Sequence, residues 1–259
     1  MMDLPLHCEI VMLAGEDTTS WIVYNRLAAV FGPFPALVEK HMPRQALIRT
    51  RMRKLGIART LSQVAFVFLV RPWLRRGGAR RIAEISRKHG LEAAAPAAHY
   101  IRHIGSVNSE ACKEALKIIA PKVVVVNGTR IIKGDVLKST PAVFLNIHQG
   151  ITPQYRGSHG SYWALYNNDA ENCGVTVHVV DEGIDTGGVV ARADANPTPD
   201  DSFVTYPYLQ TAAALPALVE AIKAVLAGTL EVKPVEGPSA VWYHPGFFQY
   251  IRGRWRGVR

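Results

Sequence analysis

The chain has 259 residues, of which 48% are hydrophobic and 20% are charged. This length allows one large domain or two small ones with a real core, and the apolar content excludes an intrinsically disordered chain. The cysteines exclude a disulfide scaffold and fit a reducing cytosol better than secretion, because only three are present and each stands alone: Cys8, Cys112 and Cys173.

The formal net charge of +9 is concentrated in one segment of the chain. Residues 39–90 hold fourteen Lys and Arg against Glu39 and Glu84, which gives this stretch a net charge of +12. The other residues hold 16 basic and 19 acidic side chains, a net of −3. A basic balance describes partners rather than fold. The sequence therefore predicts an ordinary globular body that carries a basic segment.

An apolar run, Leu61–Val70, lies inside the basic segment. It is half the ~20 residues that a spanning helix needs, and the start of the chain has no basic region typical of a signal peptide. Three interpretations stay open: a buried helix between solvated arginines, a basic amphipathic hairpin on anionic lipid, and a phosphate-binding patch. Nucleic acid is not favoured, because no aromatic interleaving or RNA-binding signature is present.

Apolar runs and helix-period patterns alternate along the rest of the chain. Buried strands are predicted at 8–15, 34–40, 91–95, 122–128, 143–150, 174–181 and 189–195. Helices are predicted at 21–31, 106–120, 159–169 and 201–227, the second with Ala111, Ala115, Leu116 and Ile119 on its inner face. This order predicts an α/β fold with a doubly wound, mostly parallel, Rossmann-like sheet, and residues 41–90 as a basic helical insertion.

The loop after the first strand does not suit a phosphate. It has no GxGxxG pattern, and Glu16 and Asp17 stand where an anion requires backbone N–H groups and no negative charge.

Two later strand ends concentrate polar residues. Strand alternation puts Asn146 and His148 on the same side, and the next strand ends in an acidic, glycine-rich loop, 181–188. Loops at the carboxyl ends of a doubly wound sheet line its ligand crevice, where an amide, an imidazole and a carboxylate suit acyl transfer to an amine. The alternatives are a structural His148, an Asn146 that satisfies backbone groups, and an acidic loop that is solvated or that binds a cation with His148, His159 or His178. No HExxH or EF-hand spacing is present, so no metal is predicted.

The stretches FLNIHQGITPQYRGSHGSYWALYNND and GVTVHVVDEGIDTGGVV resemble the catalytic core of the 10-formyltetrahydrofolate-dependent formyltransferases. That family includes glycinamide ribonucleotide transformylase, methionyl-tRNA formyltransferase and the sugar N-formyltransferases. The resemblance runs from about Pro121 to Gly228 and rests on an Asn-x-His strand, a PxYRG turn and a DxGxDTG loop.

The resemblance implies roles for individual residues. Asn146, His148 and Asp185 match the catalytic set: a substrate amine attacks the formyl carbon, Asn146 and protonated His148 hold the oxyanion, and Asp185 supports His148. The resemblance also implies that 10-formyltetrahydrofolate is the formyl donor, bound by Asn127, Thr129, Arg130, Ile131, Ile132, Val180, Asp181, Glu182 and Gly183. Weaker matches suggest substrate contacts at Gly150, Tyr155, Arg156 and His159.

Departures from the family pattern shape the expected function. Gly150 and Thr152 replace usual family residues, Glu16 and Asp17 stand in place of a phosphate loop, and few residues follow Gly228. We therefore expect a cytoplasmic N-formyltransferase with a catalytic domain at 1–230 and an aromatic, basic extension at 231–259. Its acceptor is expected to be the primary amine of a small anionic molecule, with an amino-sugar nucleotide as the leading candidate.

Several alternatives remain beside that expectation. They are formylation of methionyl-tRNA or glycinamide ribonucleotide, hydrolysis of 10-formyltetrahydrofolate, and a catalytically silent relative that binds a membrane or a partner. Residues 44–81 are the candidate contact with an anionic membrane surface, which would place the enzyme peripherally on the inner face of the membrane. The sequence leaves the oligomeric state open.

Overall fold

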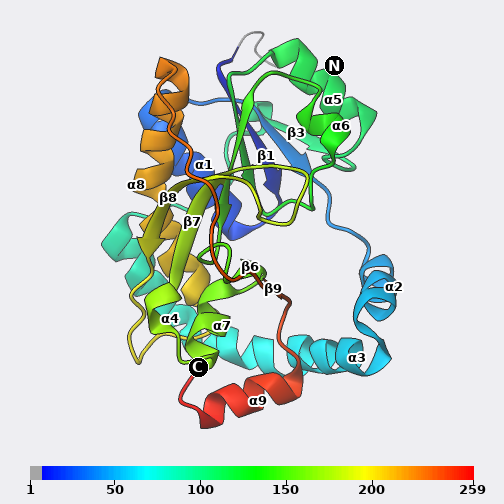
Figure 1. Cartoon of the computed structure of the whole chain (residues 1–259), viewed down its shortest axis with the longest axis vertical. Helices are drawn as coiled ribbons and strands as arrows, with labels where there is room; N and C mark the ends of the chain where they lie inside the picture. The colour runs from blue at the N-terminus through cyan, green and yellow to red at the C-terminus, as the bar shows by residue number, and fades with distance from the viewer. Residues whose placement is uncertain (1–7) are drawn as a thin grey trace.

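The computed structural model describes residues 8–259, which build a seven-stranded sheet with helices on both faces (Figure 1). The strand order is β3-β2-β1-β4-β5-β7-β8. Neighbours from β3 to β5 are parallel, whereas β7 runs antiparallel to β5 and β8 antiparallel to β7. The predicted mostly parallel α/β sheet is confirmed. Its strands are β1 Ile10–Gly15, β2 Ala36–Glu39, β3 Ile101–Ile104, β4 Val123–Asn127, β5 Val143–His148, β7 Gly174–Val179 and β8 Val189–Asp194.

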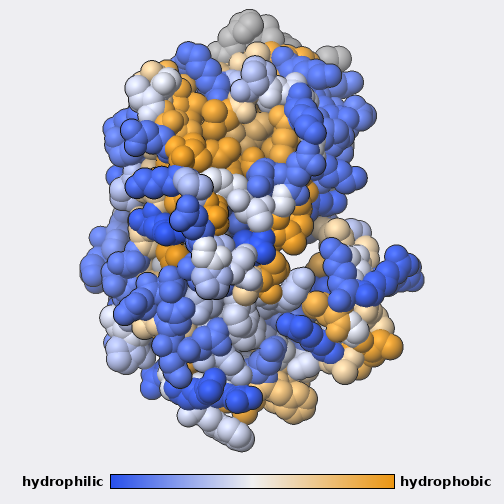
Figure 2. Space-filling model, in the orientation of Figure 1, coloured by the Kyte–Doolittle hydropathy of each residue, from blue (hydrophilic) through white to orange (hydrophobic). Residues whose placement is uncertain are grey.

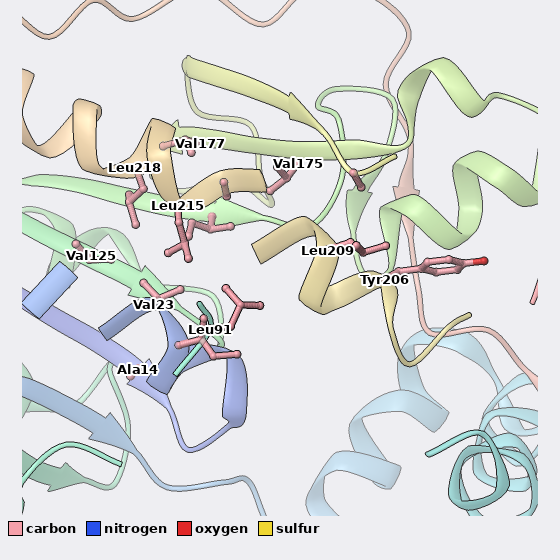
Figure 3. Packing of buried hydrophobic residues seen from close by; sticks show 14 of the residues in the cluster. Ala14, Val23, Leu91, Val125, Val175, Val177, Tyr206, Leu209, Leu215 and Leu218 are labelled. Carbon is pink, nitrogen blue, oxygen red and sulfur yellow. The ribbon is translucent and has the colours of Figure 1, made fainter. Parts of the chain in front are cut away.

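Two hydrophobic cores lie on opposite faces of the sheet, because alternate residues of each strand point to opposite sides. Helices α1 (Thr18–Phe31) and α8 (Tyr206–Ala227) cover one face, and α5 (Glu110–Ile119) and α6 (Gly134–Leu137) cover the other. Figure 3 shows Leu215 and Leu218 of α8 packed toward Val125 and Val177 of the sheet. Helix α8 is long and apolar enough to cross a membrane, yet half of its apolar window is buried in this core.

The basic segment is helical, as predicted, and stands partly away from the sheet (Figure 1). The apolar run inside it is not fully buried: Phe66 is 0% exposed, whereas Phe68 and Leu69 are 59% and 69% exposed. Only one side of the run packs on the body, so the expectation of a buried helix holds for that side alone. The segment consists of α2 (Arg44–Leu55), α3 (Ile57–Ala65), η1 (Phe66–Val70) and α4 (Arg71–His89).

Ring packing and an ion pair are among the contacts that attach this insertion to the body. The Phe66 ring lies 5.1 Å from Phe203 and 5.0 Å from Tyr250 of α9 (Phe247–Trp255). The Arg81 guanidinium forms a two-pronged ion pair with Asp201, whose side chain is 0% exposed, with N–O distances of 2.9 and 3.0 Å. Such bidentate pairs fix geometry as well as charge. The insertion is therefore held to the body through both ring packing and charge.

The structure corrects two local predictions. Residues 91–95 do not form a strand: Leu91 is buried, and the Asn25 side chain donates to the carbonyls of Glu92 and Ala94, which takes them out of any ladder. On α5 the inner face carries Cys112 rather than Ala111. The remaining elements are α7 (Gly160–Tyr166), the paired β6 (Arg156–Gly157) and β9 (Val241–Trp242), η2 (Ala98–Tyr100) and η3 (Ala170–Asn172).

Candidate active site

The carboxyl end of β5 brings Asn146 beside His178 of the neighbouring strand. The two residues face each other in the antiparallel β5–β7 register, and Nδ2 of Asn146 lies 3.0 Å from Nε2 of His178. Nδ1 of His178 lies 2.9 Å from the Val179 carbonyl and donates to it, so Nε2 accepts from the Asn146 amide. This bond fixes the orientation of the amide and leaves its second N–H for a ligand.

His148 is buried two residues further along β5, and protein oxygens flank both of its ring nitrogens. Nε2 donates to the Tyr155 carbonyl at 2.7 Å, and Nδ1 lies 3.3 Å from Oδ2 of Asp185. Burial lowers the pKa of His148, while the nearby Asp185 carboxylate and the Tyr155 carbonyl act in the opposite direction and only partly compensate. A neutral His148 therefore points an unprotonated Nδ1 at a carboxylate, and a proton arriving there is shared by both groups.

Asp185 is positioned by backbone from two loops. Its own φ of 49° is left-handed, a conformation that Asp tolerates better than most residues, and the Gly157 N–H donates to its Oδ2 at 2.9 Å. Burial raises the pKa of Asp185, but the neighbouring His178 and His148 imidazoles and the Gly157 N–H outweigh burial and lower it. Asp185 is therefore a carboxylate at neutral pH.

These side chains line a cleft of about 320 Å³, here called the central cleft. Asn146, His148 and Asp185 lie on its wall, so the structure brings together the three residues expected to be catalytic. Asn127 and His159 also line it, together with Asp17, Thr19 and Gln149.

A second hollow of about 490 Å³, the adjoining cavity, shares Asn146 and Asp185 with the central cleft. Leu47 and Lys54 of α2 line its outer side, and Figure 2 shows α2 standing across a gap from the body. Most residues expected to bind the folate lie on its wall: Thr129, Arg130, Ile131, Ile132, Val180, Asp181 and Gly183.

Two of the expected folate contacts lie elsewhere. Asn127 is buried, and its side chain donates to the Ser20 hydroxyl. Glu182 is exposed and accepts a hydrogen bond from Lys138 at 2.8 Å. Neither lines the adjoining cavity.

The four weaker substrate matches also divide. His159 lines the central cleft, and an Arg156 N–H donates to the Ile184 carbonyl beside Asp185. Gly150 and Tyr155 are buried behind His148, where the Tyr155 hydroxyl donates to Asp169 and its carbonyl accepts from His148. These last two residues support the His148 imidazole rather than line the central cleft or the adjoining cavity.

Sequence reasoning treated His178 only as an alternative metal ligand. Its contact with Asn146 depends on the antiparallel pairing of β5 and β7, which no pattern within either strand specifies. The one signal in the sequence that bears on the position of His178 is alternation along β7, which puts it on the same side of the sheet as Thr176.

Comparison with known proteins matches the formyl transferase family model to residues 80–222. The methionyl-tRNA formyltransferase of Desulfotalea psychrophila is 33% identical over 128 residues, which cover 49% of this chain and 39% of that protein. The chain thus matches less than half the length of that relative.

Solved structures share the fold at low sequence identity. A sugar N-formyltransferase from a Shewanella species superposes with a TM-score of 0.60 at 14% identity, covering 97% of this chain and 88% of that one. An N-formyltransferase of Helicobacter canadensis, solved with folinic acid and dTDP-3-aminofucose, gives a TM-score of 0.53 at 15% identity, covering 90% and 70%. Because the family model matches more than half of the residues, this chain belongs to the formyl transferase family.

Proposed function

We propose that this protein is an N-formyltransferase that moves a formyl group from 10-formyltetrahydrofolate to a primary amine. The observation that carries the proposal is the 3.3 Å approach of His148 Nδ1 to the Asp185 carboxylate, with Asn146 on the wall of the same cleft. An amide donor beside a buried imidazole–carboxylate pair supplies both oxyanion stabilisation and proton transfer.

In the proposed reaction the acceptor amine attacks the formyl carbon, and the carbonyl electrons move to the oxygen. The free N–H of Asn146 donates to that oxyanion, while His148 Nδ1 takes the proton released by the amine. Asp185 stabilises the resulting imidazolium. Collapse of the intermediate breaks the bond between the formyl carbon and N10 of the folate, and N10 receives the proton from His148.

This scheme modifies the role expected for His148. Its Nε2–H is engaged by the Tyr155 carbonyl and burial lowers its pKa, so a neutral His148 that begins as a proton acceptor suits this structure better than an imidazolium that holds the oxyanion. Asn146 then carries the oxyanion contact alone among the three.

We place the folate in the adjoining cavity. It is bounded by a strand-end segment, Thr129–Ile132, and by the loop 180–183, and it opens onto the central cleft through Asn146 and Asp185. The Helicobacter canadensis protein of this fold binds folinic acid, a folate of the same chemical class. Asn127, which bonds to Ser20, and Glu182, which bonds to Lys138, are not assigned to this site.

We propose an amino sugar with an anionic carrier as the acceptor, and an amino-sugar nucleotide as its leading form. The dTDP-3-aminofucose complex of the Helicobacter canadensis protein supports this choice. The acceptor amine would enter the central cleft past His159, with Arg156 holding the loop that carries Asp185 and with Gly150 and Tyr155 packed behind His148. In this proposal residues 1–230 form the catalytic domain with the insertion at 41–90, residues 231–259 form an extension, and the enzyme acts in the cytoplasm.

The test is incubation with 10-formyltetrahydrofolate and a panel of amines, following release of tetrahydrofolate. Losses of ~10²–10⁴-fold are expected for His148→Ala and Asp185→Ala, since each removes an acid–base group. Asp194→Asn, an exposed carboxylate at the end of β8, is the matched control and should turn over normally. Wild-type rates in both catalytic variants would reject the assignment, and formate release without an amine would indicate a hydrolase.

An anionic membrane surface is a second partner that the insertion suggests. Leu61, Phe68, Leu69 and Trp73 are each about 60–70% exposed, among the arginines of residues 44–81. Basic, apolar faces of this kind bind anionic lipid. Co-sedimentation with anionic vesicles at low salt, lost at high salt, is the expected result, and sedimentation equal to that with neutral vesicles would exclude it.

A further inference from the structure

A third cavity, of about 640 Å³, lies on the insertion and is here called the insertion cavity. One part of its wall is apolar, and the other carries three guanidinium groups, those of Arg51, Arg71 and Arg75. The remaining lining residues are Leu47, Ile48, Gln63, Val64, Val67, Phe68, Pro72 and His244.

The three arginines gather positive charge, and no acidic residue among the described residues lines the insertion cavity. Within residues 8–259, no ion pair or side-chain hydrogen bond engages any of them. By contrast, two other arginines of α4 are paired, Arg81 with Asp201 and Arg80 with Glu84. Burial lowers the pKa of Arg51, and burial together with the charge of Arg75 lowers the pKa of Arg71. Desolvated like charges are unfavourable unless an anion joins them, so this arrangement favours a bound anion.

Gln63 also lines this cavity. Its side chain is buried, and Nε2 donates to the His244 carbonyl at 2.6 Å, which fixes the amide orientation. Its Oε1 is buried, without a hydrogen-bond partner among the described residues and without surface open to the cavity. Gln63 therefore holds His244 at the cavity wall and is assigned no ligand contact.

The arginines also connect this cavity with the site of chemistry. Arg71 and Arg75 line a further hollow of about 290 Å³ together with Gln149 and His159. These last two residues also line the central cleft that holds His148. A path of shared wall residues thus runs from the guanidinium groups to the catalytic imidazole.

We propose that the insertion cavity binds the phosphate group of the amine acceptor, with Arg51, Arg71 and Arg75 as its donors. The assignment of the bound phosphate to the amine acceptor rests on the proposed function. The anion site itself rests on the cavity and its unpaired charges. Guanidinium groups match phosphate oxygens in geometry and charge. The apolar wall of the cavity contacts the carrier beyond that phosphate.

The test measures binding by calorimetry at constant ionic strength, with inorganic pyrophosphate, UDP and decyl phosphate as probes. Arg51→Gln and Arg71→Gln should each weaken binding about 10-fold or more, because a hydrogen bond to a charged group is lost. Arg76→Gln is the matched control: it removes the same charge from an exposed position of α4 that does not line the cavity, and should change affinity less than about 2-fold.

The probes separate the two sources of phosphate. Binding of UDP more tightly than pyrophosphate assigns a nucleotide-linked acceptor, and tighter binding of decyl phosphate assigns a lipid-linked one. Absence of binding by all three probes, or equal binding by wild type, Arg51→Gln and Arg71→Gln, overturns the proposal.

Turnover separates this inference from the proposed function. If the Arg71→Gln enzyme formylates its amine with an unchanged KM, the proposed phosphate site is rejected and the proposed formyl transfer stands. Arginine-dependent phosphate binding in a protein that formylates no amine rejects the proposed function and leaves an anion site without its acceptor.

Discussion

The side-chain amide of Asn146 is held by an imidazole from the adjacent antiparallel strand: its Nδ2 lies 3.0 Å from Nε2 of His178. His178 in turn donates from Nδ1 to the Val179 carbonyl, and its Nε2 also lies 3.7 Å from Oδ1 of Asp185. One imidazole thus touches two of the three proposed catalytic residues. We infer that His178 is a positioning residue for the amide that receives the oxyanion.

Replacing His178 by Phe should therefore lower kcat about 10- to 100-fold, because a freely rotating Asn146 amide no longer points at the oxyanion. The KM for the formyl donor should change less than kcat, because His178 forms only part of the wall of the adjoining cavity. His178→Gln, whose side-chain oxygen accepts a hydrogen bond as Nε2 does, should recover part of the lost kcat. Steady-state kinetics of the two variants measures this split.

A structural role alone would give a different pattern. If His178 only fills space, the Phe variant should keep its kcat and the Gln variant should lose more. Equal kcat values for the two variants would contradict the positioning role.

Gly150 is a second position where local geometry controls the catalytic imidazole. A Cβ added there would lie 2.8 Å from Nε2 of His148 and would also contact the Tyr155 carbonyl that accepts from it. Gly150→Ala should therefore destabilise the fold by about 1–3 kcal/mol and lower turnover, because the rigid backbone carbonyl cannot move away. Urea denaturation and initial rates measure both effects.

Gly105 provides the control for that substitution. It is exposed, has no atom within 4 Å of an added Cβ and has no left-handed backbone constraint. Gly105→Ala should leave stability within about 0.5 kcal/mol of wild type. If the two alanine variants behave alike, the packing behind His148 has room that this structure does not show.

The sequence was sufficient to predict features that depend on neighbouring residues along the chain. The Val-rich run before Asn127 predicted β4, and alternation along β5 predicted that Asn146 and His148 share a side. It failed at β3, because Ile101–Ile104 is a short edge strand in which two consecutive polar residues break the alternation, while the more apolar 91–95 segment became a loop.

Features of the site that join distant parts of the chain could not be predicted from the sequence. The Asn146–His178 contact requires a particular strand register, and the gathering of Arg51 with Arg71 requires α2 to fold back along α3. Net charge indicated that residues 39–90 were unusual but not which arginines lie together. Such placements are set by tertiary packing rather than by periodicity.

The buried Asp201 carboxylate should contribute strongly to the attachment of the insertion. Asp201→Asn leaves Arg81 without its charged partner, and we expect a loss of about 2–3 kcal/mol in the free energy of unfolding, since hydrogen bonds between charged groups are lost. Glu84→Gln, which removes a 43% exposed carboxylate from the same arginine, should have an effect below about 1 kcal/mol. Urea denaturation compares the two, and equal losses would show that Asp201 is not the anchor.

Stability should also fall in mild acid because of a histidine at the edge of the insertion cavity. Burial lowers the pKa of His244 to about 4, and the charges of Arg51 and Arg71 lower it while a hydrogen bond to Pro245 opposes them. An unfolded histidine titrates near 6.5, so between about pH 6.5 and 4 the unfolded chain binds a proton that the folded chain excludes. His244 therefore contributes stability above pH 6.5 that is lost as the pH falls, up to about 3 kcal/mol at pH 4.

The substitution His244→Phe isolates this contribution, because it keeps a ring against Phe66 and removes the titrating group. Urea denaturation at several pH values from 4.5 to 7.5 should show a pH slope smaller than that of wild type by up to about 1.4 kcal/mol per pH unit. A residual slope is expected, since burial also lowers the pKa of His148 and, together with His244 and the arginines, that of His159. An unchanged slope would mean that His244 is protonated in the folded protein, and hence that the insertion cavity admits solvent to its floor.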